Sequence, residues 1–169
     1  NLVYQSDQAF EYLIDYFSQV EEPTMICMFG DHQPQVATNF YTEALGGEVE
    51  ALDTDTAEKK QIVPFVIWAN YPLPQDGPEV TSLNFLGQHV LRYAGIESSL
   101  YGNFLWQMQQ SVPALSFPGY WDARGEAYSH LENNGYTALI QDYARVQYNN
   151  LFGGEERRDG LFGSRQRDR

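Results

Sequence analysis

A short apolar run that ends in a glycine constrains the fold of this chain more than any other feature. Residues 24–29 read Thr-Met-Ile-Cys-Met-Phe, and Gly30 ends the run. Because the run shows no alternation of polar and apolar side chains, it is typical of a strand buried on both faces. Pro23 directly before it separates this strand from whatever precedes it.

The segment before this strand predicts an amphipathic helix. Ser6 and Asp7 suit a helix N-terminus, and the helix is expected to end near Val20, before Pro23. Its apolar residues follow the i, i+3, i+4, i+7 spacing: Phe10, Leu13, Ile14 and Phe17. A helix followed by a buried strand implies a layered α/β sheet, so α/β is the expected fold class.

Further along the chain the patterns are more varied. They predict a strand over 62–69 that contains Pro64, a helix over 82–95 that Gly95 ends, and helices over 104–112 and 139–150. Between 44 and 60 the chain is acidic and glycine-containing, which favours a solvated loop over a loop that gates a substrate channel. Residues 114–135 are expected to be mostly irregular, and a polar tail begins at Gly154.

The charge of the chain limits its partners. The formal net charge is -13 and the isoelectric point is about 4.4. Such a surface repels phosphates, so a nucleic-acid partner is excluded and a phosphorylated substrate would need a cation. With 169 residues, of which 43% are hydrophobic, the chain is long enough for one domain with a sizeable core.

The termini and the single cysteine add little about the compartment. Cys27 has no possible intrachain disulfide partner and is expected to be a buried thiol. No apolar run approaches the roughly 18 residues of a membrane helix, and no signal peptide is visible. Since the chain begins with Asn1 and not with Met, we expect a processed product or an excised piece.

The Gly30-Asp31-His32 sequence follows the first predicted strand directly. In open α/β sheets, functional groups gather at the carboxyl ends of strands. The carboxylate of Asp31 and the imidazole of His32 offer a divalent cation one hard and one borderline ligand, which suits Mn²⁺ or Zn²⁺ and is less diagnostic of Mg²⁺. Taken alone, this pair is weak evidence for a metal site, and a turn-forming aspartate with a surface histidine explains it better.

A longer pattern surrounds this pair. Residues 23–34 resemble the Pro-Thr-(apolar run)-Phe-Gly-Asp-His-x-Pro signature of the lipoteichoic acid synthase-like sulfatases, which are phosphoglycerol transferases of the alkaline phosphatase superfamily. The resemblance continues in register and covers about residues 1–153. Its further matching segments are Ser6-Asp7 and residues 64–70, 82–95 and 148–153.

The resemblance implies a fold and a site. Residues 1–153 would be the C-terminal portion of a catalytic domain built as a three-layer α/β/α sandwich, with 154–169 as a polar tail. Asp31 and His32 would hold a divalent cation, Mn²⁺ first and Zn²⁺ or Mg²⁺ as alternatives. The other ligands and the nucleophilic threonine would lie upstream of Asn1, so the metal site is incomplete in this chain.

Two residues near the pair differ from what a complete site needs. Thr24 cannot replace the missing nucleophile, because it stands at the entrance of the strand that Asp31 leaves. The residue before Pro64 is commonly threonine in the resembled family and is Val63 here. This departure weakens a polar role at that position but not the strand.

The function implied for the intact protein is phosphoglycerol transfer outside the cell membrane. A metal-activated threonine would attack a phosphatidylglycerol-like lipid, release diacylglycerol and pass the glycerophosphate to an acceptor of a cell-envelope polymer. The protein would be anchored by N-terminal helices, and this chain alone would be inactive. Its partners would be the missing N-terminal half and the lipid donor, with self-association through uncovered sheet edges.

Two alternatives remain open for the function. The first is a sulfatase or phosphodiesterase that hydrolyses a soluble ester by the same metal chemistry. The second is a non-catalytic interaction module that keeps the fold.

The other histidines and the tryptophans receive no functional role. His89 and His130 are expected to be structural or solvated, because neither has a metal-ligand partner at a recognised spacing. The tryptophans are Trp68, Trp106 and Trp121, and each is embedded in an apolar pattern. They are therefore expected to be core or rim aromatics in preference to a platform for sugars.

Overall fold

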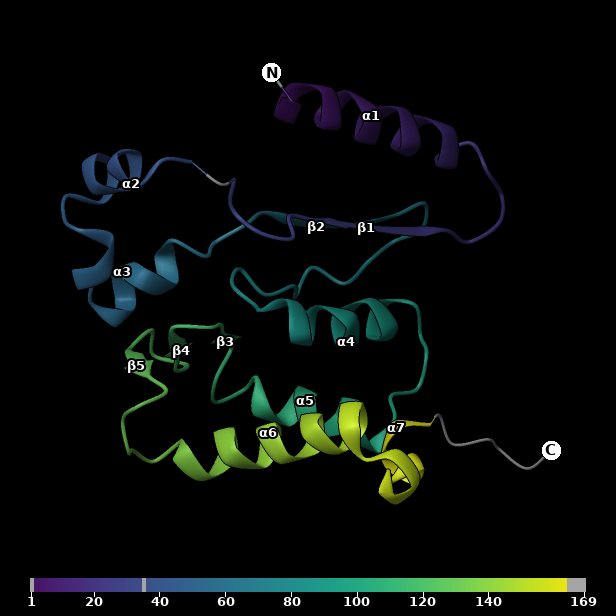
Figure 1. Cartoon of the computed structure of the whole chain (residues 1–169). Helices are drawn as coiled ribbons and strands as arrows, with labels where there is room; N and C mark the ends of the chain where they lie inside the picture. Colours follow the sequence, from purple (N-terminus) through teal and green to yellow (C-terminus); the bar gives the residue numbers. More distant parts are fainter. Residues whose placement is uncertain (1, 35, 164–169) are drawn as a thin grey trace. The chain divides into compact units, whose positions relative to one another are not determined.

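A computed structural model describes residues 2–34 and 36–163 (Figure 1). The chain divides into two compact units. The first unit comprises Asn1–Asp31 and Val63–Gly77, and the second comprises His32–Ile62 and Pro78–Arg169. Helices and small sheets occur together, and the predicted α/β class is confirmed.

The first unit contains one helix and two strands. Helix α1 spans Leu2–Phe17, and strands β1 and β2 span Met25–Phe29 and Phe65–Ala69. The helix begins earlier than predicted, because Ser6 does not cap it. The Ser6 hydroxyl instead donates to the carbonyl oxygen of Leu2 at 3.2 Å, one turn back within the helix.

Strands β1 and β2 are antiparallel, with Met25 opposite Ala69 and Phe29 opposite Phe65. The carboxyl end of β1 therefore lies beside the amino end of β2. Pro64 stands just outside β2, as predicted for a proline in this run, and its carbonyl oxygen accepts from the backbone N–H of Gly30 at 3.0 Å. Among the described residues, each of these strands pairs with the other alone.

Asn70 ties the amino end of β1 to the end of α1. Its side-chain oxygen accepts from the backbone N–H of Thr24 at 2.9 Å. Its amide nitrogen lies within hydrogen-bond distance of three carbonyl oxygens, those of Phe17 at 3.2 Å, Val20 at 2.8 Å and Glu22 at 2.9 Å. One partly buried side chain thus satisfies the backbone groups that the helix end and the strand start leave open.

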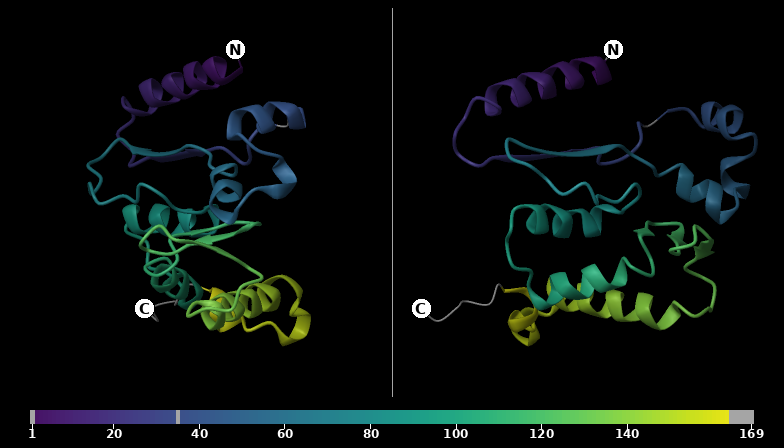
Figure 2. Two further views of the ribbon diagram at one scale, coloured as in Figure 1. Left: turned by 90° about the vertical axis from the view of Figure 1, so that its left-hand side faces the viewer. Right: turned by 180° about the vertical axis from the view of Figure 1, so that it is seen from behind.

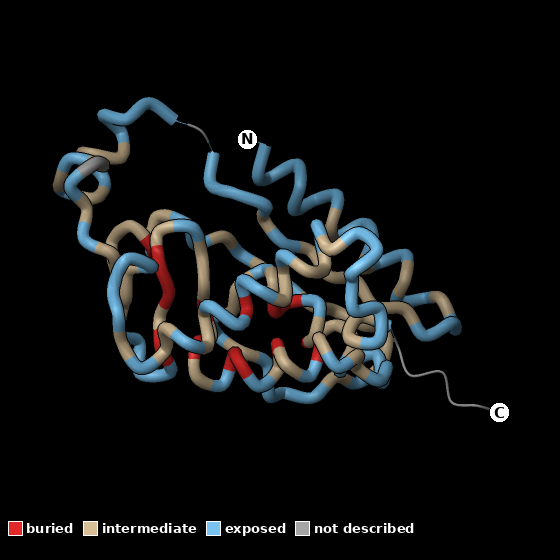
Figure 3. The backbone as a smooth tube through the Cα atoms, turned by 60° about the horizontal axis from the view of Figure 1, so that its bottom comes forward, coloured by how far each residue is buried: buried red, intermediate tan, exposed pale blue. Residues whose placement is uncertain are grey.

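The second unit holds the core of the described chain. Helices α4 (Leu83–Tyr93), α5 (Leu100–Met108) and α6 (Thr137–Phe152) lie side by side in both views of Figure 2. Their contact is a cluster of four buried residues, namely Phe85, Leu105, Met108 and Tyr143. Every residue described as buried belongs to this unit, and Figure 3 shows these residues in red.

The predicted ends of these helices are partly right. The stop of α4 is confirmed, because Gly95 adopts a left-handed φ of 68° and Ile96 N–H donates to the carbonyl of Leu91 at 2.9 Å. Helix α5 begins four residues before the predicted start. Ser99 explains the difference, since its hydroxyl accepts from the N–H of Gly102 at 3.1 Å and caps the helix.

The prediction of a solvated loop over 44–60 is wrong. Helix α2 (Thr38–Leu45) reaches into this segment, and a short helix η1 (Val49–Ala51) and helix α3 (Thr54–Lys59) follow. Asp53 caps α3 by accepting from the N–H of Thr56 at 2.8 Å. Helix α3 packs on strands much later in the chain, a contact that the acidic composition of the segment does not indicate.

The segment 114–135 contains a sheet that the sequence did not predict. Strands β3 (Ala114–Leu115), β4 (Gly119–Trp121) and β5 (Ala127–Ser129) form a three-stranded antiparallel sheet, on which α3 packs. Strands of two or three residues are too short to show a period of two. Their pairing depends instead on side chains in the connecting turns.

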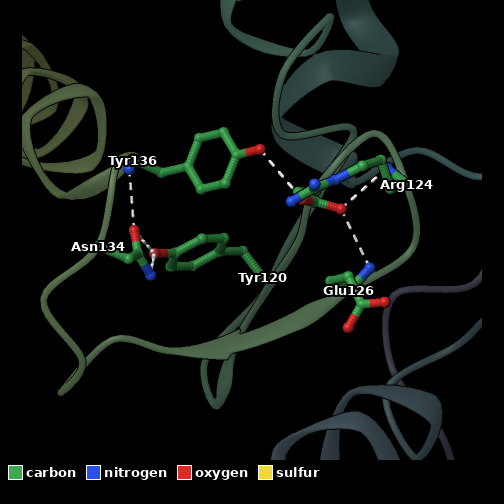
Figure 4. A network of polar contacts seen from close by, with 6 residues as sticks. Tyr120, Arg124, Glu126, Asn134 and Tyr136 are labelled. Carbon is green, nitrogen blue, oxygen red and sulfur yellow. Dashed lines mark hydrogen bonds and ion pairs between the residues drawn. The ribbon is translucent and has the colours of Figure 1, made fainter.

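A buried carboxylate organises the turn between β4 and β5. Asp122 is 1% exposed and accepts from the N–H groups of Arg124 at 2.8 Å and Glu126 at 3.0 Å. The Arg124 guanidinium and the Tyr136 hydroxyl donate to its other oxygen at 2.9 Å and 3.0 Å. Figure 4 shows Arg124, Glu126 and Tyr136 within this network of polar contacts. Burial alone would raise the pKa of this carboxyl, but these hydrogen bonds lower it to about 2.

The described part of the polar tail, up to Gly163, is packed on α5. It contains η2 (Gly154–Glu156) and α7 (Asp159–Phe162). The ring of Phe162 contacts Tyr101 with 5.2 Å between centroids, and the guanidinium of Arg157 lies 5.0 Å from the Phe162 ring. The remainder of the tail, 164–169, lies outside the described residues.

Replacing Asn70 with alanine should destabilise the first unit by about 2–4 kcal/mol. The change removes the hydrogen bond from Thr24 N–H and the contacts of the side-chain amide with three carbonyl oxygens, and three of these four contacts are partly buried. Hydrogen exchange at the Thr24 amide should accelerate by the factor that corresponds to this loss of stability. Urea unfolding should show the same decrease in the free energy of unfolding. Asn103→Ala, an exposed change within α5, is the matched control and should leave both measurements within about 0.5 kcal/mol of wild type. Equal behaviour of the two variants would contradict the role given to Asn70.

Asp122 should determine how the free energy of unfolding of the second unit decreases at acid pH. Its folded pKa of about 2 lies below the ordinary value of 3.8, so its stabilisation is present above pH 4 and is lost as the pH falls toward 2. Asp122→Asn should be less stable than wild type at pH 6 and should approach it between pH 4 and 2 in urea unfolding. The exposed Asp142→Asn is the control, and its free energy of unfolding should fall with pH as that of wild type does. The same fall with pH in Asp122→Asn would refute the assignment.

Candidate metal centre

Gly30 follows β1 directly and is required there by a close contact. A Cβ atom at this position would lie 2.9 Å from the Cβ of Val63, closer than side chains tolerate. Val63 stands where the resembled family commonly has threonine, and here its apolar side chain packs on Gly30. The contact holds the exit of β1 against the segment that enters β2.

His32 has its ring orientation set by a neighbouring carbonyl. The Nδ1 atom lies 2.8 Å from the carbonyl oxygen of Gln33. Because a carbonyl oxygen only accepts, the ring must donate from Nδ1, and in the neutral imidazole Nε2 is then the acceptor nitrogen. Histidines that bind metals through one nitrogen commonly donate from the other to such a carbonyl.

The segment after His32 is held by two further contacts within the second unit. The side-chain amide of Gln33 donates to the carbonyl oxygen of Ile62. The hydroxyl of Tyr41 in α2 donates to the carbonyl oxygen of Pro34 at 2.9 Å. These contacts fix the backbone around the His32 ring without burying it.

Asp31 is exposed and is the last residue of the first unit, whereas His32 is exposed and opens the second. As neighbours in the chain they fit one oxygen and one nitrogen ligand of a divalent cation. Within residues 2–34 and 36–163, no group of three or more His, Cys, Asp or Glu side chains is placed to hold a metal ion. The described residues therefore add no third ligand to this pair.

Thr24 lies at the opposite end of β1 from Asp31. Its hydroxyl donates to the carbonyl oxygen of Glu22 at 2.9 Å, and its N–H is bound by Asn70. Thr24 thus stands at the entrance of the strand, where the sequence placed it, and its exclusion as the nucleophile stays a prediction. Cys27 is half-buried within the strand, and burial raises the pKa of its thiol, which disfavours the reactive thiolate.

The remaining histidines occupy packed positions. His89 is buried, and its Nε2 lies 2.8 Å from Oε1 of Gln109 while its ring packs edge-on against Trp106. His130 is exposed, and its Nε2 lies 2.8 Å from the carbonyl oxygen of Ser116. Neither lies in a group of metal-ligating side chains among the described residues.

One buried acid went unnoticed in the sequence. Glu58 of α3 is 4% exposed, and one of its oxygens accepts from the hydroxyl of Ser116 at 2.9 Å. Its other oxygen, Oε1, is buried without a hydrogen-bond partner in the structure. Burial raises the pKa of Glu58, an effect that the Ser116 bond partly offsets. No periodicity in 44–60 could have shown this residue to be internal.

A membrane anchor is not visible in the described part of the chain. None of its helices is both long and apolar enough to span a bilayer.

Comparison with known proteins shows what this chain is similar to. A protein from Rhizobium meliloti (strain 1021), described as a putative cyclic beta-1,2-glucan modification protein, is 25% identical over 177 residues. The alignment covers 96% of this chain and 26% of that protein, so the chain spans about a quarter of the length of its relative. No solved structure is a significant match.

The sequence pattern of the Sulfatase family matches residues 1–96, which include both strands of the first unit, Asp31, His32 and all of α4. This match supports the alkaline phosphatase and sulfatase superfamily, and the finer resemblance to lipoteichoic acid synthases stays a prediction. Since it covers more than half of the residues, the chain belongs to the Sulfatase family.

Proposed function

We propose that the gene product containing this chain is a metal-dependent phosphoglycerol transferase, in which Asp31 and His32 are two ligands of a divalent cation, Mn²⁺ first. The observation that carries the proposal is the orientation of His32 within the segment that matches the Sulfatase family. The Gln33 carbonyl selects the tautomer whose Nε2 can coordinate. Family membership itself suggests hydrolase or transferase chemistry for the intact protein.

The proposed role of this chain is to supply and orient ligands. When bound, the cation lowers the pKa of the attacking hydroxyl and neutralises charge on the phosphoryl group. Asp31 contributes negative charge, and the contacts of Gly30 and Gln33 hold the turn that presents it. An exposed pair of ligands after β1 is open to a substrate or to the rest of the catalytic domain.

The reaction is proposed to run in two displacements. A threonine hydroxyl upstream of this chain forms a bond to the phosphorus of a phosphatidylglycerol-like lipid, and the bond from phosphorus to the diacylglycerol oxygen breaks. The threonine proton is lost and the leaving diacylglycerol oxygen gains one. In the second displacement the oxygen of an acceptor hydroxyl loses its proton and forms a bond to phosphorus, and the bond from phosphorus to the threonine oxygen breaks as that oxygen regains a proton. Because the relative from Rhizobium meliloti is described as a glucan modification protein, we propose a glucan hydroxyl as the acceptor.

The proposed setting is the extracellular face of the cell membrane, with the missing half of the catalytic domain as the main partner. Two observations support the need for such a partner. Strands β1 and β2 have one strand neighbour each among the described residues, and none of the described residues of the first unit is buried. Uncovered edges of this kind pair readily with another chain, which also supports self-association of the isolated piece.

Ester hydrolysis is the second candidate function. The Sulfatase match itself favours it, since sulfate and phosphate esters would be cleaved by the same metal chemistry with water as the final acceptor. The two functions differ only in that acceptor.

The test uses the full-length gene product with Mn²⁺, a phosphatidylglycerol carrying a fluorescent acyl chain, and a glucan acceptor. Asp31→Asn and His32→Ala should each lower diacylglycerol release by at least about 100-fold, because a ligand is lost. Calorimetry should show weaker Mn²⁺ binding in both variants. Asp7→Asn and His130→Ala are the matched controls and should retain wild-type release and binding.

Wild-type Mn²⁺ affinity in Asp31→Asn and His32→Ala would contradict the assignment of the ligands. Release of free glycerophosphate in place of glycerophosphoryl glucan, or cleavage of p-nitrophenyl sulfate with no action on the lipid, would establish the hydrolase in place of the transferase.

A further inference from the structure

A cleft of about 710 Å³ lies in the second unit, between the start of α3 and the β4–β5 turn. This volume falls within the roughly 300–1,000 Å³ of small-molecule sites. Figure 1 shows α3 beside the small sheet that forms the other wall. Eight residues line the cleft, and they are Asp53, Thr54, Asp55, Lys59, Trp121, Gly125, Glu126 and Ala127.

The indole of Trp121 is fixed at its edge. Its Nε1–H donates to Oδ1 of Asp55 at 3.1 Å, and the other oxygen of Asp55 is paired with the ammonium group of Lys59. Ala127 stands opposite Trp121 in the sheet and is small, so it adds little bulk beside the ring. Trp121 is partly exposed and lines the cleft, and this hydrogen bond uses the edge of its ring and neither of its faces.

The side of the cleft formed by the β4–β5 turn also has a fixed backbone. Gly125 and Glu126 lie in the turn that the buried Asp122 carboxylate binds through the backbone N–H groups of Arg124 and Glu126. Gly125 has a φ of 82°, a left-handed conformation that suits glycine. The Glu126 side chain is exposed at this rim, on a turn whose backbone is fixed.

The polar groups of the cleft favour a neutral ligand that carries many hydroxyls. Asp53, Asp55 and Glu126 accept hydrogen bonds, whereas Lys59 is a donor and Thr54 can do both. The hydrogen bond from Thr56 N–H lowers the pKa of Asp53, which favours its charged form. Three carboxylates against one paired ammonium group repel phosphates and sulfates.

A cationic ligand fits less well than a sugar. Cages for ammonium groups are lined by several aromatic faces, whereas this lining contains one tryptophan and also the cation Lys59. A pyranose ring instead presents an apolar C–H face, which matches the indole, and a rim of hydroxyls, which matches the mixed donors and acceptors.

We propose that this cleft binds a neutral oligosaccharide, with a pyranose ring stacked on Trp121 and its hydroxyls bound by Asp53 and Glu126. None of the residues that line the cleft is a proposed metal ligand, and the inference deepens the proposed function, on whose glucan acceptor it rests. The sequence predicts Trp121 to be a core or rim aromatic. In this proposal it lies at the rim of the cleft and forms the platform for a sugar ring.

The experiment is a titration of the ¹⁵N-labelled 169-residue chain with linear glucose tetrasaccharides of β-1,2, β-1,4 and α-1,4 linkage. The indole N–H signal of Trp121, assigned with Trp121→Phe, should shift in a saturable manner with at least one of them. Trp121→Ala should weaken binding at least about tenfold, and Glu126→Ala by about three- to tenfold. Glu126 is exposed, so its variant is expected to fold normally.

Matched controls outside the cleft are Trp106→Phe and Glu155→Ala, which should bind as wild type does. Asp31→Asn should also bind the sugar normally, so the failure of either site is distinguishable from the failure of the other. The proposal is overturned by the absence of a Trp121 shift with 20 mM of every tetrasaccharide, by binding that survives both cleft variants, or by a larger response to choline or to inorganic phosphate.

Discussion

The second unit depends on the burial of one charged group, the carboxylate of Asp122. Removing a carboxylate from water is costly, and it is tolerated here because backbone N–H groups, the Arg124 guanidinium and the Tyr136 hydroxyl all donate to it. Strands as short as β4 and β5 form few ladder bonds of their own. The carboxylate closes the turn that joins them, and that turn carries a rim of the cleft. Stability and the candidate sugar site therefore share one interaction.

The sequence predicted those elements whose side chains repeat over several turns. The apolar face of α4 could be predicted because its residues repeat at helical spacing over several turns. The end of β1 could be predicted because Gly30 directly follows an uninterrupted apolar run. Helix α3 and the small sheet were missed for the opposite reason. Glu58 and Ser116 stabilise each other across a separation of 58 residues, and an acidic residue gives no local sign that a distant hydroxyl will accompany it into the interior.

The sequence was enough to propose the candidate metal ligands, but not to predict the contacts that hold them in position. Asp31 and His32 were identified from residue types and from a resemblance in register. The structure adds the reason for Gly30, which is the approach of Val63, and the orientation of the His32 ring by the Gln33 carbonyl. Both depend on backbone positions, which a motif does not specify. Val63, which departs from the threonine of the resembled family, is the residue whose side chain leaves no room for a Cβ atom at Gly30.

Strand β1 connects the stability of the first unit to the proposed chemistry. With no buried residue among those described in this unit, hydrogen bonds at the two ends of the strand set its register. Asn70 fixes the amino end, and the bond from Gly30 N–H to the Pro64 carbonyl fixes the other. A shift of one residue in a five-residue strand would move Asp31 by about 3.3 Å and turn its side chain to the other face. Metal ligands tolerate a few tenths of an ångström, so the position of Asp31 is only as well defined as the pairing of these two strands.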